Sequence, residues 1–254
     1  MSIVGLSITD AVATITLDDQ ENRNALGATL VAAIHDALVS ANTDDTVRVV
    51  VLTHSGPIFC AGANLKEQAT ASATGATGFG DVLRLIQTGP KPVVARIAGA
   101  TMGGGIGLAC AADIAVATND ASFGFTEVRL GVAPAIISVV ALPKMGRGPA
   151  MEAFLRGNRF DGAKAVELGL IAHAVPAADL DTAVGEVVAD LLRGSPRALA
   201  GAKRLVNEVP TMTAADAFDW ATELSLELFA GPEASDGMQA FLDRREPSWV
   251  PDDL

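Results

Sequence analysis

Three short, strongly apolar segments constrain the fold of this chain more than any other feature. Residues 47–52 (VRVVVL), 93–97 and 114–117 each have the length and composition of a buried strand. Turns rich in small residues and helical patterns separate these segments. The repeated order of strand, turn and helix predicts α/β organisation. Two alternating segments, residues 4–8 and 12–17, predict a further pair of strands that turns at Asp10.

The rest of the chain predicts one large core followed by a helical appendage. Half of the 254 residues are hydrophobic, which is enough for such a core. Every segment beyond about residue 179 has helical spacing. A helix over residues 134–145 is almost entirely apolar, so we expect it to be buried. Residues 70–80, rich in Ala, Thr and Gly, predict a loop.

The charge balance disfavours several kinds of partner. Eighteen Lys and Arg against 30 Asp and Glu give a net charge of −12, which opposes binding to nucleic acid or to an anionic membrane surface. An anionic small molecule is not excluded, because a few local cations are enough to bind it. Two cysteines and three scattered histidines have neither a disulfide framework nor metal-ligand spacing. With no basic leader and no membrane-length apolar run, we expect a cytoplasmic protein.

A glycine run at residues 103–107 (GGGIG) precedes a predicted helix. It lacks the Lys-Ser/Thr of a phosphate-binding loop and the spacing of a dinucleotide fingerprint. One interpretation is a tight turn before a closely packed helix. The other is a bare backbone N–H at a helix N-terminus, presented to a developing negative charge. Residues 59–66 (FCAGANLK) form a second such turn. Two N–H donors from the two turns would form an oxyanion hole for a thioester or ester carbonyl.

Glu127 is the candidate acid–base residue near that carbonyl. It lies in an apolar segment, residues 123–131 (FGFTEVRLG), and such surroundings raise the pKa of a carboxyl group toward the range suited to proton transfer. The alternative interpretations are an ion pair with Arg129 and a solvated loop acid. Cys60 and Cys110 have apolar neighbours, so we expect both to be structural.

Several segments, in order along nearly the whole chain, resemble the signature blocks of the crotonase, or enoyl-CoA hydratase/isomerase, superfamily. They are RNAL from Arg23, FCAGANLKE, KPVVARIAGATMGGGIGLACAADIAVA, ASFGFTEVRLGVAP, FLRGNRFDGAKAVELGLIAHAVP and SDGMQAFLDRREPSW. The resemblance implies an α/β fold. Residues 1–190 would form a crotonase-like acyl-CoA-binding core, a spiral of ββα units. Residues 191–254 would form a C-terminal helical oligomerisation region, giving a homotrimer or a hexamer built as a dimer of trimers.

The resemblance also implies the site. Ala63 and Gly104 match the two oxyanion N–H donors of the family, and Glu127 matches one family carboxylate, all acting on an acyl-CoA thioester. The residues implied along the coenzyme A are Arg23, Ala25, Ala61, Asn64, Leu65, Lys66 and, from a neighbouring subunit, Arg245. Coenzyme A is part of the substrate thioester, so no separate cofactor and no metal are expected.

One position departs from the family pattern. Two-carboxylate hydratases of the superfamily carry a Glu where this chain has Gly107, which cannot transfer a proton. A single carboxylate suits a hydratase of fatty acid metabolism that adds water across the 2,3 double bond of a 2-enoyl-CoA through an enolate. The segment GVAPAIIS resembles a hydratase branch that includes methylglutaconyl-CoA-type enzymes. The alternatives are a Δ3–Δ2 enoyl-CoA isomerase and a catalytically weak acyl-CoA-binding paralogue.

Overall fold

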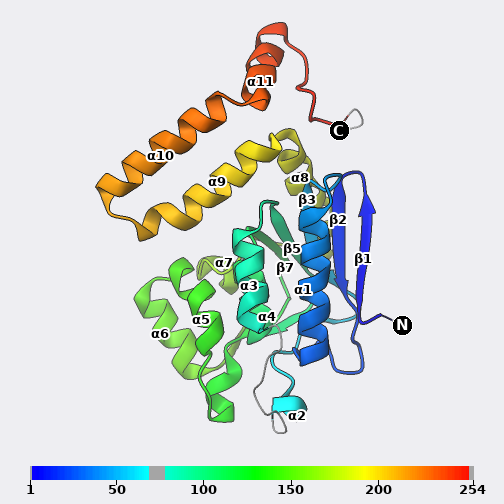
Figure 1. Cartoon of the computed structure of the whole chain (residues 1–254). Helices are drawn as coiled ribbons and strands as arrows, with labels where there is room; N and C mark the ends of the chain where they lie inside the picture. The colour runs from blue at the N-terminus through cyan, green and yellow to red at the C-terminus, as the bar shows by residue number, and fades with distance from the viewer. Residues whose placement is uncertain (1, 69–77, 252–254) are drawn as a thin grey trace.

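The computed structural model describes residues 2–68 and 78–251, which form two sheets and a set of surrounding helices (Figure 1). The larger sheet has the strand order β1-β2-β3-β5-β7-β10, and its described pairs are parallel except β1–β2. The smaller sheet has the order β4-β6-β8-β9, with β9 antiparallel. The strands are β1 (Val4–Thr9), β2 (Val12–Leu17), β3 (Val49–His54), β4 (Ile58–Cys60), β5 (Val93–Ile97), β6 (Ala100–Met102), β7 (Ile114–Thr118), β8 (Phe123–Gly124), β9 (Arg159–Phe160) and β10 (His173–Val175).

Along the chain, a unit of two strands followed by a helix recurs. β3, β5 and β7 belong to the larger sheet, and the strand that follows each of them, β4, β6 or β8, belongs to the smaller one. This repeat confirms the predicted α/β spiral of ββα units. The helices are α1 (Ala28–Thr43), α2 (Leu65–Gln68), α3 (Phe79–Thr88), α4 (Gly104–Ala111), α5 (Ala135–Ala141), α6 (Arg147–Arg156), α7 (Gly162–Glu167), α8 (Leu180–Arg193), α9 (Pro196–Glu208), α10 (Ala214–Phe229) and α11 (Pro232–Asp243).

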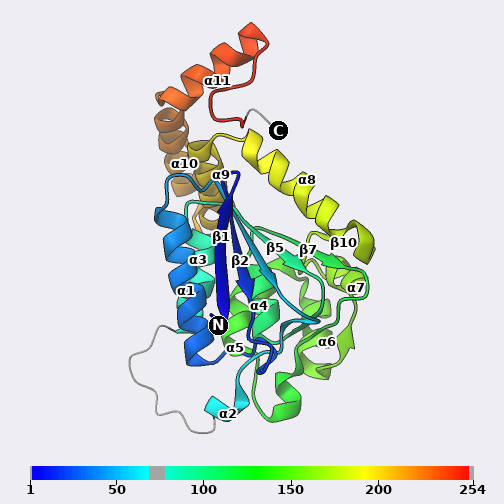
Figure 2. The same cartoon turned by 90° about the vertical axis from the view of Figure 1, so that its right-hand side faces the viewer.

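The larger sheet is covered by helices on both faces. Val50 and Leu52 of β3 belong to the main core, which α1, α3 and α4 complete, whereas Val49 and Val51 belong to a second cluster with α8. Figure 2 shows α1 and α8 on opposite sides of this sheet. Because successive strand residues point to opposite faces, a strand buried on both sides is largely apolar, as residues 49–52 of β3 are. The strand predicted over residues 47–52 is present, but it begins and ends two residues later.

The structure corrects the prediction that residues 134–145 form a buried helix. α5 ends at Ala141, and a short 3-10 turn, Leu142–Lys144, follows it. One face of α5 packs on α4 and is buried, but Ile136 and Val139 on the other face are 54% and 69% exposed. An apolar helix that packs against a neighbour on just one side exposes its other side to solvent. Most of the loop expected at residues 70–80 lies outside the described residues.

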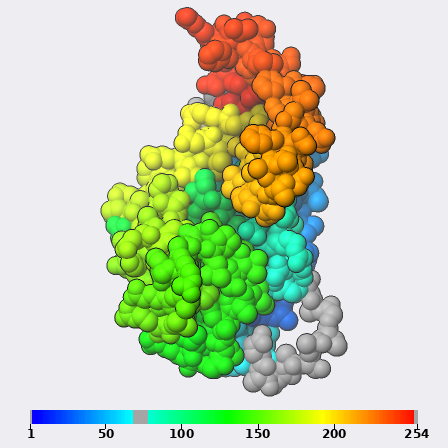
Figure 3. Space-filling view, turned by 90° about the vertical axis from the view of Figure 1, so that its left-hand side faces the viewer, coloured from blue at the N-terminus to red at the C-terminus, as the bar shows by residue number. Residues whose placement is uncertain are grey.

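The C-terminal part of the chain is helical, as predicted. Thr213 caps α10, because its Oγ1 accepts the Asp216 N–H at 3.3 Å. α8 packs on the larger sheet, whereas α10 and α11 form the orange and red end of the surface in Figure 3. The domain boundary expected at residue 190/191 falls inside α8 and stays a prediction. In the part of the chain that the structure describes, no helix combines the length and apolar character needed to cross a bilayer.

Candidate active site

Two glycine-containing turns meet at one edge of the smaller sheet. The first, residues 61–64, follows β4, and the second, residues 103–104, follows β6. β4 and β6 are parallel neighbours, so both turns leave the sheet at the same edge. Gly62 has φ +94°, and a Cβ atom there would lie 3.3 Å from the carbonyl oxygen of Met102. Glycine allows both this backbone conformation and this close approach.

Hydrogen bonds to Leu26 fix the orientation of the first turn. The Leu26 N–H donates to the Gly62 carbonyl oxygen at 2.7 Å, and the Leu26 carbonyl accepts the Asn64 N–H at 3.2 Å. In a trans peptide the C=O and N–H groups point in opposite directions, and the described chain has no cis peptide bond. The Ala63 N–H therefore points away from Leu26. Among the described residues it donates to no other group.

Gly104 presents the second backbone donor. It is the first residue of α4, so its N–H has no partner within the helix. Gly103 precedes it with φ +49° and donates its own N–H to the Gly124 carbonyl at 3.0 Å, which fixes the turn. Ala63 and Gly104 both line one cavity of about 440 Å³. The structure thus brings the two predicted donors together.

The walls of this cavity are largely apolar. Among the described residues that line it, Glu127 is the only ionisable one. These residues are Leu26, Ala61, Gly62, Ala63, Leu65, Phe79, Gly103, Gly104, Thr126, Glu127, Leu130, Val132, Ala133, Pro134, Ala135, Ile136 and Ile137.

Glu127 lies on a 3-10 helix, Thr126–Leu130, with its carboxyl group beside the second turn. A Cβ atom on Gly103 would lie 2.7 Å from the Glu127 Oε1. The Oε2 atom is buried and has no hydrogen-bonding partner among the described residues. Burial raises the pKa of Glu127, because the charged form loses solvation. The alternative of an ion pair with Arg129 is not what the structure shows. The Arg129 guanidinium donates instead to the Arg156 carbonyl at 3.3 Å.

Apolar side chains cover Gly107, one helical turn after Gly104. A Cβ atom on Gly107 would lie 2.6 Å from Cγ2 of Ile137 and 3.4 Å from a ring carbon of Phe79. The same ring carbon would lie 3.5 Å from a Cβ atom on Gly104. Hydrocarbon therefore occupies the place where two-carboxylate hydratases are expected to carry their other acid. The described site has one carboxyl group beside an apolar wall.

Most of the residues implied along the coenzyme A lie around the first turn. Ala61 and Leu65 line the cavity. The Asn64 side chain accepts the Lys66 backbone N–H at 3.2 Å, so it caps α2. The N–H of Ala61 donates at 3.1 Å to the carbonyl oxygen of Arg23. That bond places the segment that contains Arg23 and Ala25 against the same turn.

Arg245 does not reach this cavity within the chain. It follows α11, at the opposite end of the molecule from α2 (Figure 1). Its guanidinium pairs with the Asp236 carboxylate at 2.6 Å, and this contact lowers the pKa of Asp236 to about 2. A role for Arg245 in this site therefore needs a second copy of the chain.

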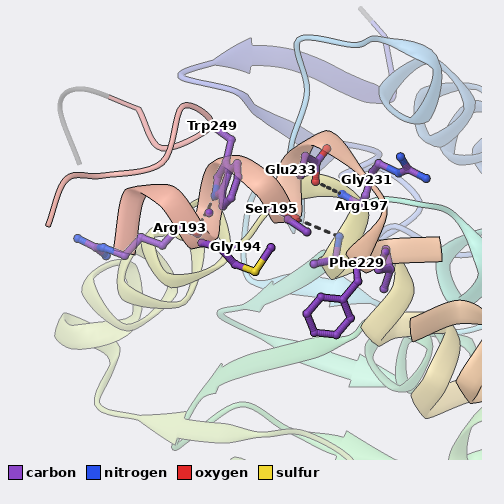
Figure 4. Close-up of a pocket in the computed structure, with 13 residues that line it drawn as sticks. Arg193, Gly194, Ser195, Arg197, Phe229, Gly231, Glu233 and Trp249 are labelled. Atoms are coloured by element: carbon purple, nitrogen blue, oxygen red, sulfur yellow. Dashed lines mark hydrogen bonds between the residues drawn. The ribbon is translucent and has the colours of Figure 1, made fainter. Parts of the chain in front are cut away.

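A second cavity, of about 460 Å³, lies between the C-terminal helices (Figure 4). Two of the groups that line it cap α9. Glu233 accepts the Arg197 backbone N–H at 3.0 Å, and Ser195 Oγ accepts the Ala198 N–H at 3.1 Å. Trp249, on another wall, donates its indole N–H to the Arg193 carbonyl at 2.9 Å. These groups hold helices together, so we assign the candidate active site to the cavity that contains Glu127.

The two thiols do not contribute reactive groups to the site. Cys60 and Cys110 are buried, and burial raises the pKa of each to about 12. Both thiols are therefore un-ionised near neutral pH, which agrees with the structural role expected for them. Among the described residues, no cluster of His, Cys, Asp or Glu side chains has the composition to hold a metal ion.

Two apolar residues that shape the cavity, Leu26 and Ile137, were not expected from the sequence. Both approach glycines of α4, and a Cβ atom on Gly104 would lie 2.3 Å from Cδ1 of Leu26. The available signal was the i, i+3 spacing of Gly104 and Gly107, which indicates a helix face open to close neighbours. Which side chains fill that face depends on tertiary contacts between distant segments.

Comparisons with known proteins agree with this geometry. The sequence model of the enoyl-CoA hydratase/isomerase family matches residues 7–251. A Rhodobacter capsulatus protein named "Probable enoyl-CoA hydratase" is 34% identical over 257 residues, which cover 96% of each chain. The structure of Pseudomonas aeruginosa AtuE matches with a TM-score of 0.91 and 33% identity, covering 98% of this chain and 100% of that one.

A Mycobacterium smegmatis enoyl-CoA hydratase structure matches with a TM-score of 0.90 and 29% identity, covering 99% of this chain and 100% of the other. Family, relatives and fold thus agree over nearly the full length. The chain belongs to the enoyl-CoA hydratase/isomerase family of the crotonase superfamily.

Proposed function

We propose that the protein is an enoyl-CoA hydratase, which adds water across the 2,3 double bond of a 2-enoyl-CoA with Glu127 as its single acid–base residue. The observation that carries this proposal is the Glu127 carboxyl group, whose buried Oε2 has no hydrogen-bonding partner among the described residues and which lies beside two turns that offer backbone N–H donors. Relatives that are named as hydratases support the same reaction.

The proposed steps use only groups of this site. The thioester oxygen accepts the N–H groups of Ala63 and Gly104, which stabilise the charge that develops there. The Glu127 carboxylate takes a proton from water as the water oxygen bonds to C3, and the π electrons move into an enolate. Protonated Glu127 then gives a proton to C2. This step releases the 3-hydroxyacyl-CoA and restores the carboxylate, so one carboxyl group is enough.

The proposed substrate is an acyl-CoA, with coenzyme A as part of it and no separate cofactor. Arg23 and Lys66 place positive charge near the first turn on a chain whose net charge is −12, as recognition of an anionic substrate requires. The apolar wall formed by Phe79 and Ile137 suits the acyl group. Residues 131–138 contribute part of the cavity, and their resemblance to the methylglutaconyl-CoA-type branch favours a branched acyl group. We also propose that the protein is located in the cytoplasm.

The apolar cover over Gly107 favours a second candidate, a Δ3–Δ2 enoyl-CoA isomerase. In that reaction Glu127 would take a proton from C2 of a 3-enoyl-CoA and return it at C4, and no water takes part. Ile137 and Phe79 exclude water from the side of α4 that they cover, which suits such a transfer. The third possibility from the sequence, a weak acyl-CoA-binding paralogue, would bind these esters without converting them.

A panel of 2-enoyl- and 3-enoyl-CoA esters in deuterated water, with mass analysis of each product, separates these functions. Hydration predicts a 3-hydroxyacyl-CoA with deuterium on C2. A shifted double bond without added oxygen would replace the hydratase proposal with the isomerase. Tight binding without either product would overturn both.

The variant Glu127→Gln tests the role of the carboxyl group. We expect binding of enoyl-CoA to be retained and turnover to fall about 10²- to 10⁴-fold, the usual contribution of a general acid–base group. The glutamine has nearly the same shape, so the fold should be unchanged. Hydration at close to the wild-type rate in this variant would remove Glu127 from the mechanism.

We also propose that the protein assembles into a homotrimer or a hexamer through its C-terminal helices. Phe218, Phe229 and Phe241 in these helices are 76%, 67% and 84% exposed. Apolar groups of this size are seldom left in solvent together, and clusters of them mark interfaces. In such an assembly Arg245 of one copy would approach the substrate of a neighbour.

A further inference from the structure

Asn24 is a fully buried polar residue that does not line the cavity. Its backbone has φ +52°, and Arg23 before it has φ +56°. Two successive non-glycine residues in this left-handed region are costly and need support from their surroundings. The Asn24 side chain provides it, because Oδ1 accepts the Asp19 N–H and Nδ2 donates to the Ile58 carbonyl, each at 2.8 Å. These bonds tie the turn after β2 to the first residue of β4.

The segment that the Asn24 side chain holds is also hydrogen-bonded to the first glycine-containing turn, residues 61–64. Arg23 accepts the N–H of Ala61 at 3.1 Å, and Leu26 bonds to both Gly62 and Asn64. β4, which begins at the Ile58 that Asn24 contacts, leads directly into the same residues. Asn24 therefore connects the strand that delivers the Gly62–Ala63 peptide with the segment that orients it.

We propose that Asn24 is a positioning residue for the reaction, which directs the Ala63 N–H toward the substrate through the Leu26–Gly62 hydrogen bond. Asn24 itself does not line the cavity. The inference rests on the proposed function, since it requires the Ala63 N–H to bind a thioester oxygen. An oxyanion donor is effective when it is held in place before the reaction, and a misplacement of about 1 Å costs about a hundredfold in rate.

The variant Asn24→Gly tests this role. Glycine keeps the left-handed backbone, and the substitution removes both side-chain hydrogen bonds. We expect kcat to fall about ten- to a hundredfold, with a change in KM below about threefold, because the donor acts mainly in the transition state. The matched control is Asn22→Gly in the same turn. Asn22 is exposed, and among the described residues its side chain donates only to the Asp19 carboxylate, so kcat should stay within about twofold of wild type.

A second readout does not depend on turnover. The infrared stretch of the thioester carbonyl in bound, ¹³C-labelled butyryl-CoA reports the strength of the two N–H donors. Wild type and Asn22→Gly should shift this stretch to lower wavenumber than in solution, and Asn24→Gly should shift it less. A purely structural role would lower the melting temperature and leave both kcat and the carbonyl stretch unchanged, and that result would overturn the proposal.

The two proposals fail in different ways. A wild-type protein that shifts the carbonyl stretch but does not hydrate enoyl-CoA would overturn the hydratase proposal. The role of Asn24 would still be decided by comparing the carbonyl stretch in wild type and in Asn24→Gly. Should Asn24→Gly fail to fold, Asn24→Asp takes its place. Aspartate keeps the acceptor for the Asp19 N–H and loses the donor to Ile58. The same loss of kcat and of carbonyl shift is expected for it.

Discussion

The Glu127 carboxyl group is partly buried, and its removal from water raises its pKa above that of an exposed glutamate. As the general base it must be ionised in the free enzyme. We therefore expect kcat/KM for hydration to decrease as the pH falls through a value above the ordinary glutamate pKa, and to be level above it. The pH–rate profile measures this limb. A limb at the position of an exposed glutamate, or its persistence in Glu127→Gln, would contradict the assignment.

Gly107 decides whether a second carboxyl group can be added to the site. The family pattern alone suggests that Gly107→Glu supplies the missing acid, but Ile137 already occupies the space in front of this glycine. We expect the single variant to gain no hydration and to lose about 1–3 kcal/mol of unfolding free energy, the usual cost of overpacking. Urea unfolding and hydration rates measure the two effects.

The variant Gly107→Glu/Ile137→Ala provides the complementary test. Removing the Ile137 side chain beyond Cβ eliminates the 2.6 Å contact with a Cβ atom at position 107 and leaves the Cβ of residue 137 at 3.2 Å. The double variant should therefore hydrate enoyl-CoA faster than Ile137→Ala alone. Faster hydration by the single variant Gly107→Glu, with unchanged stability, would show that the packing argument is wrong.

Among the helices, α9 is attached to the core by a largely buried ion pair. The Lys203 ammonium donates to the Asp113 carboxylate at 2.8 Å and to the carbonyls of Ile86 and Lys91. Burial lowers the pKa of Lys203 and raises the pKa of Asp113, because each charged form loses solvation, and this loss opposes the attraction between the two groups. The pair therefore fixes the place of α9 more than it adds net stability.

Breaking this pair from one side should be costly. We expect Lys203→Met to lower the unfolding free energy by about 3 kcal/mol, because it leaves the Asp113 charge without its partner. Adding Asp113→Asn should recover part of the loss. Chemical denaturation measures both, with Lys164→Met as the control, since Lys164 pairs with Glu167 on an exposed helix face. A loss as small as that of the control would contradict the anchoring role.

Elements with a strong local pattern were predictable from the sequence, and the contacts between distant elements were not. β5 has the predicted bounds, and the helix caps at Asn64, Asp161 and Thr213 are of the same local kind, because each depends on neighbours within a few residues. The exposed side of α5 and the cover over Gly107 depend on how α4 and α5 pack. The apolar character of residues 134–145 predicted a helix, but it did not show which face another element covers.

The candidate site divides in the same way. Ala63, Gly104 and Glu127 were expected to act together because they match the site residues of the family motifs. The structure brings all three to one cavity. The role inferred for Asn24 was not expected, because its left-handed backbone and its bond to Ile58 join residues that are far apart in the sequence. One polar residue before a predicted helix does not indicate a left-handed backbone or a contact with a distant strand.

For the whole molecule, the dominant unexplained feature is apolar surface on the C-terminal helices. The large apolar side chains on these helices that are between 66% and 84% exposed are Val206, Phe218, Leu226, Phe229, Phe241 and Leu242. A single exposed apolar residue is ordinary, but a set this large on three successive helices indicates an interface. The outward face of α5 adds Ile136 and Val139. Cyclic assembly covers such patches on every copy, because a heterologous contact closes into a ring.

Light scattering at low protein concentration should therefore give three or six times the chain mass of 25.9 kDa. Phe229→Glu/Phe241→Glu should shift the mass toward the monomer, because it places charge in the proposed interface, whereas Leu6→Glu on exposed β1 should not. Deleting the chain from Thr211 should give aggregated or inactive protein, since it uncovers the face of α9 on which Leu224 and Leu228 lie beside Gly201. A stable, fully active 25.9 kDa monomer would show that these helices need no partner.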